Sequence, residues 1–482
     1  MHIHRRQFIF GPNPINTNPG WVQVVIPGVG YLCHCPELNL TSVNDADGHP
    51  WFLLGSAIQT DANRTDPSND ISLATSDTIQ DLYQTWTGRW VLIGSSKLHI
   101  DSSGLLGCFY ILRQNAKGES KLWVSSSVAL LTEVLGLNDK PTHLISHGVG
   151  IDWYPPPGIC RSSIRKLLPS QILELNGGGL IPRRLIPEIS RTLSYEEILD
   201  RIQSYLVTTL QRAEKIQDRI WLPLTAGYDS RLLLAAAISA GISFQTYTHI
   251  NPYMSEADRS LPPKLAEKVG ISHSMFYGKV YRKDLAALYD KHTGGMSVGR
   301  DRYYISQEYF NWAKKGDLIL RGGCFEFGRS YYWSKFPGHG IISNAPEVNI
   351  ILRGFKEEAN PALVQALAEW VDWTRQTQHN DMDWRDRFYL EQRLAGWLSS
   401  VEQSLDLIDA DRFHTVNSQY YFAHVLRVPE EKRRISQHQV DLIARMAPEL
   451  LEFPFNPAVS TRQKFFRKMR LAADFLKSRL GL

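Results

Sequence analysis

Residues 223–237 read PLTAGYDSRLLLAAA, and this stretch decides how the second half of the chain is built. The apolar run at 219–224, RIWLPL, is short enough for a buried strand, and residues 229–241 have the composition of a helix. A turn of small residues joins them, and it contains Gly227, which is able to adopt a positive φ. A strand, a glycine turn and a helix N-terminus together predict an anion site, because the first N–H groups of a helix have no partner within it.

The side chains of this turn suit a phosphate group. Thr225 and Ser230 offer hydroxyl groups, and Arg231 offers a cation. The carboxylate of Asp229 would repel a bare anion, but it suits a metal ion that bridges to the phosphates. The alternative is a tight strand-to-helix turn in which Asp229 caps the helix. The turn matches neither G-x-x-x-x-G-K-[ST] nor G-x-G-x-x-G, the two common nucleotide loops.

The second half of the chain alternates between two patterns. Their order is strand (219–224), helix (229–241), strand (244–250), helix (255–269) and strand (273–276). This βαβαβ order predicts a parallel sheet with helices on both faces and ligand sites beyond the carboxyl ends of its strands. The residues after about 360 have a mostly helical pattern.

The first half of the chain is β-rich instead. Short β-branched or aromatic runs, separated by Gly, Asn, Asp or Ser, occur at 20–28, 50–58, 88–94, 108–114 and 120–126. The pattern then becomes helical, with Ser194 as N-cap and Glu197 three residues later. We therefore expect two domains, 1–185 and 190–482.

Composition excludes several classes of protein. The chain has 482 residues and a net charge of +4, which is too small to indicate nucleic-acid binding. No run approaches 18 apolar residues, so we expect no membrane span. Five cysteines, an odd number, argue against a disulfide framework and favour a cytoplasmic location.

The turn at 225–230, Thr-Ala-Gly-Tyr-Asp-Ser, resembles the pyrophosphate loop of the ATP-pyrophosphatase superfamily, whose pattern is Ser-Gly-Gly-x-Asp-Ser. The changes keep a hydroxyl group and a small residue. The resemblance extends to the asparagine-synthetase-like enzymes and covers most of the chain. GRWVLIG, DSSGLLGCFYI and WVSSSVALLTEVLG, which begin at residues 88, 101 and 123, are similar in order to motifs of that family's glutaminase-like domain.

The resemblance implies a fold and two cofactors. The fold is α/β: an N-terminal glutaminase-like αββα sandwich, Ntn-hydrolase-like, is followed by a synthetase domain with a parallel sheet. That second domain is adenine-nucleotide α-hydrolase-like and has a helical C-terminal part. The implied cofactors are ATP and Mg²⁺. The residues that the resemblance assigns to nucleotide binding are Leu224, Thr225, Ala226, Gly227, Tyr228, Asp229, Ser230, Arg231, Thr248, Gly322 and Gly323.

Two departures from the family pattern bear on function. The family's working glutaminases use an N-terminal Cys as nucleophile, whereas this sequence has His2, so we expect no glutamine hydrolysis. The family also holds Mg²⁺ with a second Asp in a downstream Gly-rich loop. The corresponding stretch, LRGGCFEFGRSYYW at 320–333, has no Asp, and Glu326 is the candidate that completes the metal site with Asp229. The alternative is that Glu326 is an ion-paired loop residue, with Arg329 beside it.

Two more residues are candidates for catalysis. Glu391, in RFYLEQRLAGWLSSVEQ at 387–403, aligns with a carboxylate that β-lactam-forming members of the family use to deprotonate the attacking amine. The alternative is an ordinary ion pair with Arg387 or Arg393. Those members also use a lysine near the C-terminus, for which Lys464 is the candidate. They use a tyrosine near the metal loop as well, and we find none at the matching place.

These features predict an ATP-dependent amide ligase that forms AMP and pyrophosphate. It would adenylate a carboxylate and transfer the acyl group to an amine, as lasso-peptide macrolactam cyclases and β-lactam synthetases do. The expected partners are a carboxylate substrate, such as a modified or leader-bearing peptide, and a protein of the same pathway. One alternative is an amidating ligase that uses free ammonia. Another is a pseudoenzyme or binding module that keeps the fold. A third, a nucleic-acid-modifying enzyme, is disfavoured because the sequence has neither a zinc cluster nor a strong charge.

Overall fold

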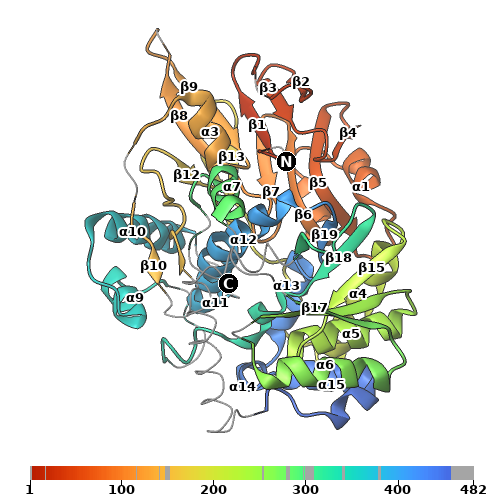
Figure 1. The fold of residues 1–482 in the computed structure, drawn as a ribbon. Coiled ribbons are helices and arrows are strands. Elements are labelled where there is room, and N and C mark those ends of the chain that lie inside the picture. Colours follow the sequence, from red (N-terminus) through yellow and green to blue (C-terminus); the bar gives the residue numbers. More distant parts are fainter. Residues whose placement is uncertain are drawn as a thin grey trace.

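The computed structural model describes residues 3–16, 18–115, 117–139, 142–146, 152–251, 254–277, 283–296, 298, 309–338, 342, 344–377 and 382–457. His2 and Lys464 lie outside the described residues. Figure 1 shows the strands of the first half of the chain, drawn in red and orange, beside a third sheet that contains β15 to β19. In the part of the chain that is described, no helix is both long and apolar enough to cross a membrane.

The first half of the chain forms two antiparallel sheets of six strands each. The first has the order β12-β8-β9-β1-β3-β2, and its strands are β1 (Phe8–Gly11), β2 (Val22–Ile26), β3 (Gly30–His34), β8 (Phe109–Gln114), β9 (Ser120–Ser125) and β12 (Arg165–Lys166). The second has the order β14-β13-β7-β6-β5-β4, and its strands are β4 (Leu40–Asn44), β5 (Pro50–Gln59), β6 (Trp86–Gly94), β7 (Lys97–Ile100), β13 (Gln171–Glu174) and β14 (Leu180–Pro182). A separate hairpin pairs β10 (Ile145–Ser146) with β11 (Asp152–Trp153).

The two sheets pack face to face, and helices cover their outer faces. Alternate residues of a strand point to opposite faces of a sheet. In β1, Phe10 belongs to the core between the two sheets, whereas Ile9 belongs to a cluster with α3 (Val128–Leu135) on the outer face. The outer face of the second sheet shares a cluster with α1 (Pro67–Leu73) and α2 (Ile79–Tyr83). These four layers agree with the αββα arrangement expected from the sequence.

The second half of the chain builds a five-stranded parallel sheet with the order β17-β16-β15-β18-β19. The chain adds strands on one side of β15 and then returns to add strands on the other side, so the strand order reverses between β15 and β18. Open α/β sheets bind ligands at such a reversal. The elements are α4 (Tyr195–Ala213), β15 (Arg219–Pro223), α5 (Tyr228–Ala240), β16 (Gln245–Ile250), α6 (Glu256–Lys268), β17 (His273–Tyr277), β18 (Asp317–Arg321) and β19 (Asp411–His414).

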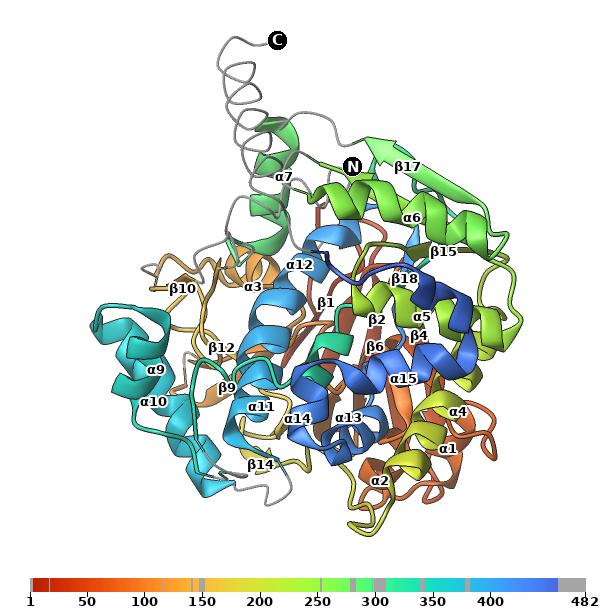
Figure 2. The same cartoon turned by 90° about the horizontal axis from the view of Figure 1, so that it is seen from below.

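The βαβαβ segment confirms the sequence prediction, because all five elements begin and end within one residue of the expected positions. The expected capping box is also present at the start of α4, where Ser194 and Glu197 exchange hydrogen bonds. Helix α5 is apolar on every side because it contacts the sheet, α4 and α15, and Figure 2 shows these helices together. No disulfide joins the five cysteines, and all of them are buried.

The C-terminal part is mostly helical, as the sequence predicts. Element η2 is a π-helix. The Lys166 side chain of β12 donates a hydrogen bond to the backbone carbonyl of Ala395 in this helix. π-Helical segments are rare in proteins, and those that occur are often found at functional sites. The elements are α7 (Lys283–Thr293), η1 (Phe325–Arg329), α9 (Val348–Phe355), α10 (Pro361–Gln376), α11 (Trp384–Phe388), η2 (Tyr389–Leu398), α12 (Ser399–Ser404), η3 (Leu405–Leu407), α13 (Gln419–Arg427), α14 (Glu430–Arg434), α15 (Gln437–Met446) and η4 (Pro448–Glu452).

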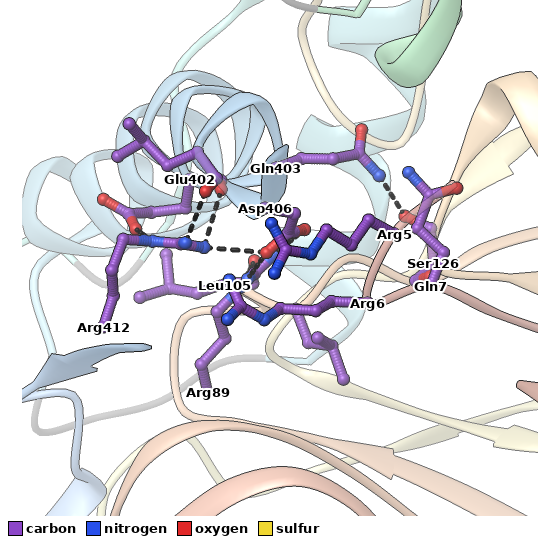
Figure 3. Close-up of polar contacts among 12 residues, drawn as sticks. Arg5, Arg6, Gln7, Arg89, Leu105, Ser126, Glu402, Gln403, Asp406 and Arg412 are labelled. Atoms are coloured by element: carbon purple, nitrogen blue, oxygen red, sulfur yellow. Dashed lines mark hydrogen bonds and ion pairs between the residues drawn. The ribbon is translucent and has the colours of Figure 1, made fainter. Parts of the chain in front are cut away.

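A chain of ion pairs joins the first half of the protein to the parallel sheet (Figure 3). Arg89 of β6 donates from Nη2 to Asp406 Oδ2 at 2.9 Å. Arg412 of β19 donates to Asp406 Oδ1 at 2.7 Å and to Glu402 Oε2 at 3.2 Å. Arg6, which precedes β1, donates to two backbone carbonyls of the segment after Asp406. Each buried charge of this junction therefore has an opposite charge or a carbonyl dipole beside it.

Candidate functional site

Two loops meet at the reversal of the parallel sheet. One follows β15 and leads into α5, and the other follows β18 and leads into η1. Since β15 and β18 are parallel neighbours, their carboxyl ends lie at the same edge of the sheet. The structure thus brings together the two sequence motifs that were expected to form the site.

The turn after β15 is held by its own side chains. The backbone N–H of Thr225 donates to Ser230 Oγ at 3.0 Å, and the two hydroxyl oxygens are 2.8 Å apart. The N–H of Gly227 donates to Thr225 Oγ1 at 3.1 Å, and the N–H of Ala226 donates to Asp258 Oδ1 at 3.0 Å. The hydroxyl groups of Thr225 and Ser230 therefore shape the turn.

Gly227 does not use its capacity for a positive φ. It is the N-cap residue of α5, with an extended backbone of φ −81° and ψ 173°, and no side chain caps the helix. A Cβ atom on Gly227 would lie 3.3 Å from Thr225 Oγ1 and 3.6 Å from Asn456 Oδ1, so the position favours glycine for space. The uncapped first turn of α5 is the part of the loop suited to an anion.

Arg231 does not face this anion site, contrary to the sequence prediction. Its side chain is fully buried, and its guanidinium donates to the backbone carbonyl of Ala226. It also donates to three backbone carbonyls in and just after η4, those of Leu450, Phe453 and Pro454. Burial lowers the pKa of Arg231 to about 10. The residue ties the end of η4 to the turn, so its contribution to the site is to hold the loop in place.

Leu224 and Thr248 lie at the ends of the two neighbouring strands. The Leu224 N–H donates to the Tyr247 carbonyl at 2.8 Å, and Thr248 Oγ1 donates to the Leu224 carbonyl at 2.7 Å. Both side chains are buried. These bonds extend the pairing of β15 with β16 up to the turn, which fixes the position of Ala226 and Gly227.

Asp229 and Glu326 lie on either side of one arginine. Arg329 Nη1 is 3.6 Å from Asp229 Oδ2 and 3.9 Å from Glu326 Oε1. The exposed fraction of the side chain is 28% for Asp229, 26% for Glu326 and 30% for Arg329. A ligand from solvent can therefore reach all three. Arg329 therefore lies within ion-pairing distance of both carboxylates.

The two carboxylates have further hydrogen bonds. Gln439 of α15 donates to Asp229 Oδ1 at 2.8 Å, and Tyr389 of η2 donates its hydroxyl to Glu326 Oε2 at 2.6 Å. Burial raises the pKa of Asp229 to about 6; Arg329 and Gln439 oppose this shift, and Glu326 adds to it. Burial, and then Glu326, raise the pKa of Tyr389 well above its ordinary value, so Tyr389 remains a donor.

The donor set at this place fits a magnesium ion. Mg²⁺ takes oxygen ligands and is commonly held by one or two carboxylates together with substrate phosphates. Asp229 and Glu326 supply two carboxylates beside the uncapped N-terminus of α5. The turn after β18 lies close by, where a Cβ on Gly323 would be 3.1 Å from the Leu398 side chain and a Cβ on Gly322 would be 3.5 Å from Phe325. Glycine at 323 lets this turn lie against η2.

Glu391 lies away from these loops, in a buried cluster between the two halves of the chain. It is fully buried, and its Oε2 accepts from Arg387 Nε at 2.9 Å and from Trp370 Nε1 at 2.9 Å. Its Oε1 accepts from the backbone and the hydroxyl of Ser170. A general base needs a lone pair within reach of the substrate proton. This geometry favours the ion-pair interpretation, with Arg387 as the partner.

The sequence analysis did not predict a role in the site for two residues, Arg329 and Tyr389. Arg329 was noted only as a neighbour of Glu326, because sequence position does not show which arginine faces an anion. Tyr389 is 63 residues from Glu326 along the chain, so no local motif joins them. The arginine three residues after a loop carboxylate was the available signal for Arg329. Lys464 cannot be placed, since it lies outside the described residues.

A pocket also lies at the junction drawn in Figure 3, lined in part by Arg6, Arg89 and Arg412. Each of these arginines is ion-paired, Arg6 with Asp411 at 3.1 Å and the other two with Asp406. Their charges are already compensated, so this pocket is a poorer place for a polyphosphate than the loops at the sheet reversal.

Comparisons with known proteins add little to this geometry. No family model matches the chain, and no curated protein matches it. One of 35 matching chains of solved structures is the glutamine-dependent NAD⁺ synthetase from Acinetobacter baumannii in complex with adenosine diphosphate. The identity is 14% and the TM-score 0.21, and the match covers 42% of this chain and 41% of that chain. The chain therefore matches less than half of that structure, and so low a TM-score supports no argument about fold or activity.

Proposed function

We propose that this protein is an ATP-dependent amide ligase that forms AMP and pyrophosphate. The observation that carries the proposal is the meeting, at the reversal of a parallel sheet, of an uncapped helix N-terminus with Asp229, Glu326 and Arg329. A helix N-terminus favours phosphate, and the paired carboxylates suit the cation that accompanies ATP. The proposal includes the finer fold assignment, an Ntn-hydrolase-like first domain (1–185) and an adenine-nucleotide α-hydrolase-like second domain (190–482).

The residues of the site have distinct proposed roles. The first turn of α5, from Tyr228 onward, binds the phosphates of ATP. Asp229 and Glu326 hold Mg²⁺, which when bound supplies positive charge to the phosphates in the transition state. Arg329 leaves the two carboxylates and pairs with a phosphate. Tyr389 donates to Glu326 and orients it. Lys464 remains the candidate for a further cation at the site.

The reaction proceeds in two steps. A carboxylate oxygen of the substrate attacks the α-phosphorus of ATP, and the bond to pyrophosphate breaks, which leaves an acyl-adenylate. The nitrogen of an amine then attacks the acyl carbon, the bond to AMP breaks, and the amine loses a proton. The protein contributes orientation and a fixed arrangement of N–H groups and cations around the phosphates. The proposed substrates are the carboxylate and amine of a peptide or natural-product precursor that forms an amide or lactam.

The first domain is proposed not to hydrolyse glutamine, so the amine comes from a substrate and not from glutamine. The described chain before β1 supports a structural role for this part of the sequence. Gln7 is fully buried, and its Nε2 donates to the carbonyl of His292 at 3.1 Å. His4, also buried, has its Nδ1 3.0 Å from Gln7 Oε1. An ammonia-using ligase of the same kind is the nearest alternative.

A second class of function, a nucleotide-binding pseudoenzyme, has one observation in its favour. Arg329 already lies between the two carboxylates that a metal ion would need. If Arg329 stays there, the site binds nucleotide without a metal ion and has no adenylation activity.

The exchange of pyrophosphate into ATP tests the proposal. An adenylating ligase given its carboxylate substrate returns labelled pyrophosphate to ATP in a magnesium-dependent reaction. We expect this exchange with a carboxylate from the same pathway, and we expect it to stop when EDTA is added. A protein that binds ATP but shows no exchange with any candidate carboxylate would be the pseudoenzyme.

A further inference from the structure

Arg393 is a buried arginine for which the described part of the chain supplies no ion pair. It lies on the π-helix η2, and only 3% of its surface is exposed. Its Nε and Nη1 atoms are enclosed and make no hydrogen bond. In the described part of the chain, no carboxylate lies within ion-pairing distance of its guanidinium. A buried charge that is neither paired nor hydrogen-bonded is costly, so its presence needs an explanation.

The neighbouring arginines of the same stretch are fully engaged. Arg387 pairs with Glu391 and donates to the Thr377 carbonyl at 2.6 Å. Arg385 pairs with Asp383 through two nitrogens, at 2.7 and 2.8 Å. The described residues thus provide charged partners for Arg385 and Arg387 and none for Arg393. The missing partner of Arg393 is accordingly an anion that does not belong to the described chain.

The surroundings of Arg393 are aromatic. Its guanidinium carbon lies 4.1 Å from the ring centroid of Trp397, which is a stacking contact. Tyr389 precedes it by four residues on the same helix, and the Tyr389 ring is 5.5 Å from that of Tyr331. Trp397 and Tyr331 are only partly buried. An anion at this place would lie among ring faces, with access from the side of these two residues.

Arg393 is close to the proposed reaction centre without being part of the phosphate site. Tyr389 donates to Glu326, so Arg393 lies one helical turn from a residue that touches the metal-binding carboxylate. Arg329, and not Arg393, lies beside Asp229 at the start of α5. The phosphates and the second anion would therefore meet different arginines.

We propose that Arg393 binds the carboxylate of the acyl substrate and holds it for activation. The planar guanidinium fork matches a carboxylate through two parallel hydrogen bonds. The aromatic surroundings favour an organic carboxylate with an apolar group beside it. This inference rests on the proposed ligase function for its choice of carboxylate over phosphate. The binding of an anion at Arg393 stands on the unpaired guanidinium alone.

Thermal unfolding with defined probes tests this assignment. Sodium phenylacetate is the carboxylate probe, phenylacetamide is its neutral match, and inorganic phosphate at equal ionic strength represents the other source of anion. We expect phenylacetate to raise the Tm of the wild type and to leave the Tm of Arg393→Met unchanged. Phenylacetamide should give no increase, and any increase with phosphate should be the same in the two proteins. The wild type and Arg393→Met should bind Mg·ATP with the same Kd.

The unliganded variants give an independent readout. Replacing the unpaired cation by an apolar side chain of similar length should raise the Tm of Arg393→Met above that of the wild type. Arg387→Met is the matched control, and it should lose Tm because it leaves Glu391 unpaired. A loss in Arg393→Met as large as in Arg387→Met would overturn the proposal, as would equal stabilisation of both proteins by phenylacetate.

The remaining outcomes separate the two proposals. Stabilisation by phosphate that Arg393→Met abolishes, together with weaker binding of Mg·ATP by that variant, would overturn the carboxylate assignment. These two results together would indicate that Arg393 binds a phosphate of the nucleotide. A protein that binds phenylacetate through Arg393 but binds no ATP would retain the carboxylate site and lose the ligase function.

Discussion

Arg329 stands between Asp229 and Glu326, with Nη1 3.6 Å from one carboxylate and 3.9 Å from the other. These are ion-pair distances without hydrogen bonds, at side chains that keep about a quarter to a third of their surface exposed. An exposed pair of this kind contributes little to stability. Arg329 can therefore leave at small cost, as the proposed binding of a metal ion by the two carboxylates requires.

Removal of the Arg329 charge should change metal and nucleotide binding in opposite directions. In Arg329→Gln the carboxylates lose their internal cation, so we expect Mn²⁺ to bind at least about tenfold more tightly without nucleotide, roughly 1.4 kcal/mol. Electron paramagnetic resonance of free Mn²⁺ measures this. ATP should bind more weakly, because a phosphate has lost its cation. Equal Mn²⁺ affinity in the two proteins would refute competition between Arg329 and the metal ion.

Asp229→Asn should separate stability from activity. The raised pKa of about 6 means that the folded protein holds a proton on Asp229 more tightly than the unfolded chain does. Stability therefore falls as pH rises from about 4 to about 6, and the ionised group destabilises the fold at pH 7. We expect Asp229→Asn to have a higher Tm than wild type at pH 7, and a smaller advantage at pH 4.5. A lower Tm at pH 7 would contradict the pKa assignment.

The same substitution should remove adenylation. Without the carboxylate at position 229, we expect pyrophosphate exchange to fall at least about 100-fold, roughly 2.7 kcal/mol in the barrier.

In the wild type, Mg·ATP affinity should also fall as the pH drops below about 6 and Asp229 takes up a proton. Asp200→Asn, a change in an exposed ion pair with Arg445, is the control and should leave exchange unaltered.

Glu391→Gln should act on stability. It leaves Arg387 buried without a compensating charge, so urea unfolding should show a loss of about 3 kcal/mol or more. The control is Glu369→Gln, in the partly exposed pair with Arg165, where the change should stay within about 1 kcal/mol. A Glu391→Gln protein of normal stability that forms adenylate but no amide would instead show that Glu391 is the base.

Three strands of the parallel sheet, β15, β16 and β17, and the helices between them could be predicted from the sequence because each has a clear local pattern, whereas β18 and β19 were not identified. The turn from β15 into α5 and the strand β16 are examples, with short apolar runs and a strongly helical stretch between them. The strand β1 could not be recognised, since its four residues lie in a mixed N-terminal stretch and become a central strand only through pairing with β3 and β9.

The candidate site was predictable only in part. Asp229 and Glu326 could be found because each lies at the start of a helical segment that closely follows a strand. Arg231 was misplaced because its position in the first turn of α5 does not reveal that its side chain turns back to the carbonyls after η4. Tyr389 is brought to Glu326 by long-range packing of the π-helix η2, which has no signal in local sequence.

Calorimetric titration with ATP tests the central claim most directly, because it needs no knowledge of the carboxylate substrate. The account predicts that the wild type binds ATP, that Mg²⁺ strengthens the binding, and that Asp229→Asn abolishes only the strengthening by Mg²⁺. No binding of ATP by the wild type would contradict it. So would an Asp229→Asn protein in which Mg²⁺ strengthens ATP binding as much as in the wild type.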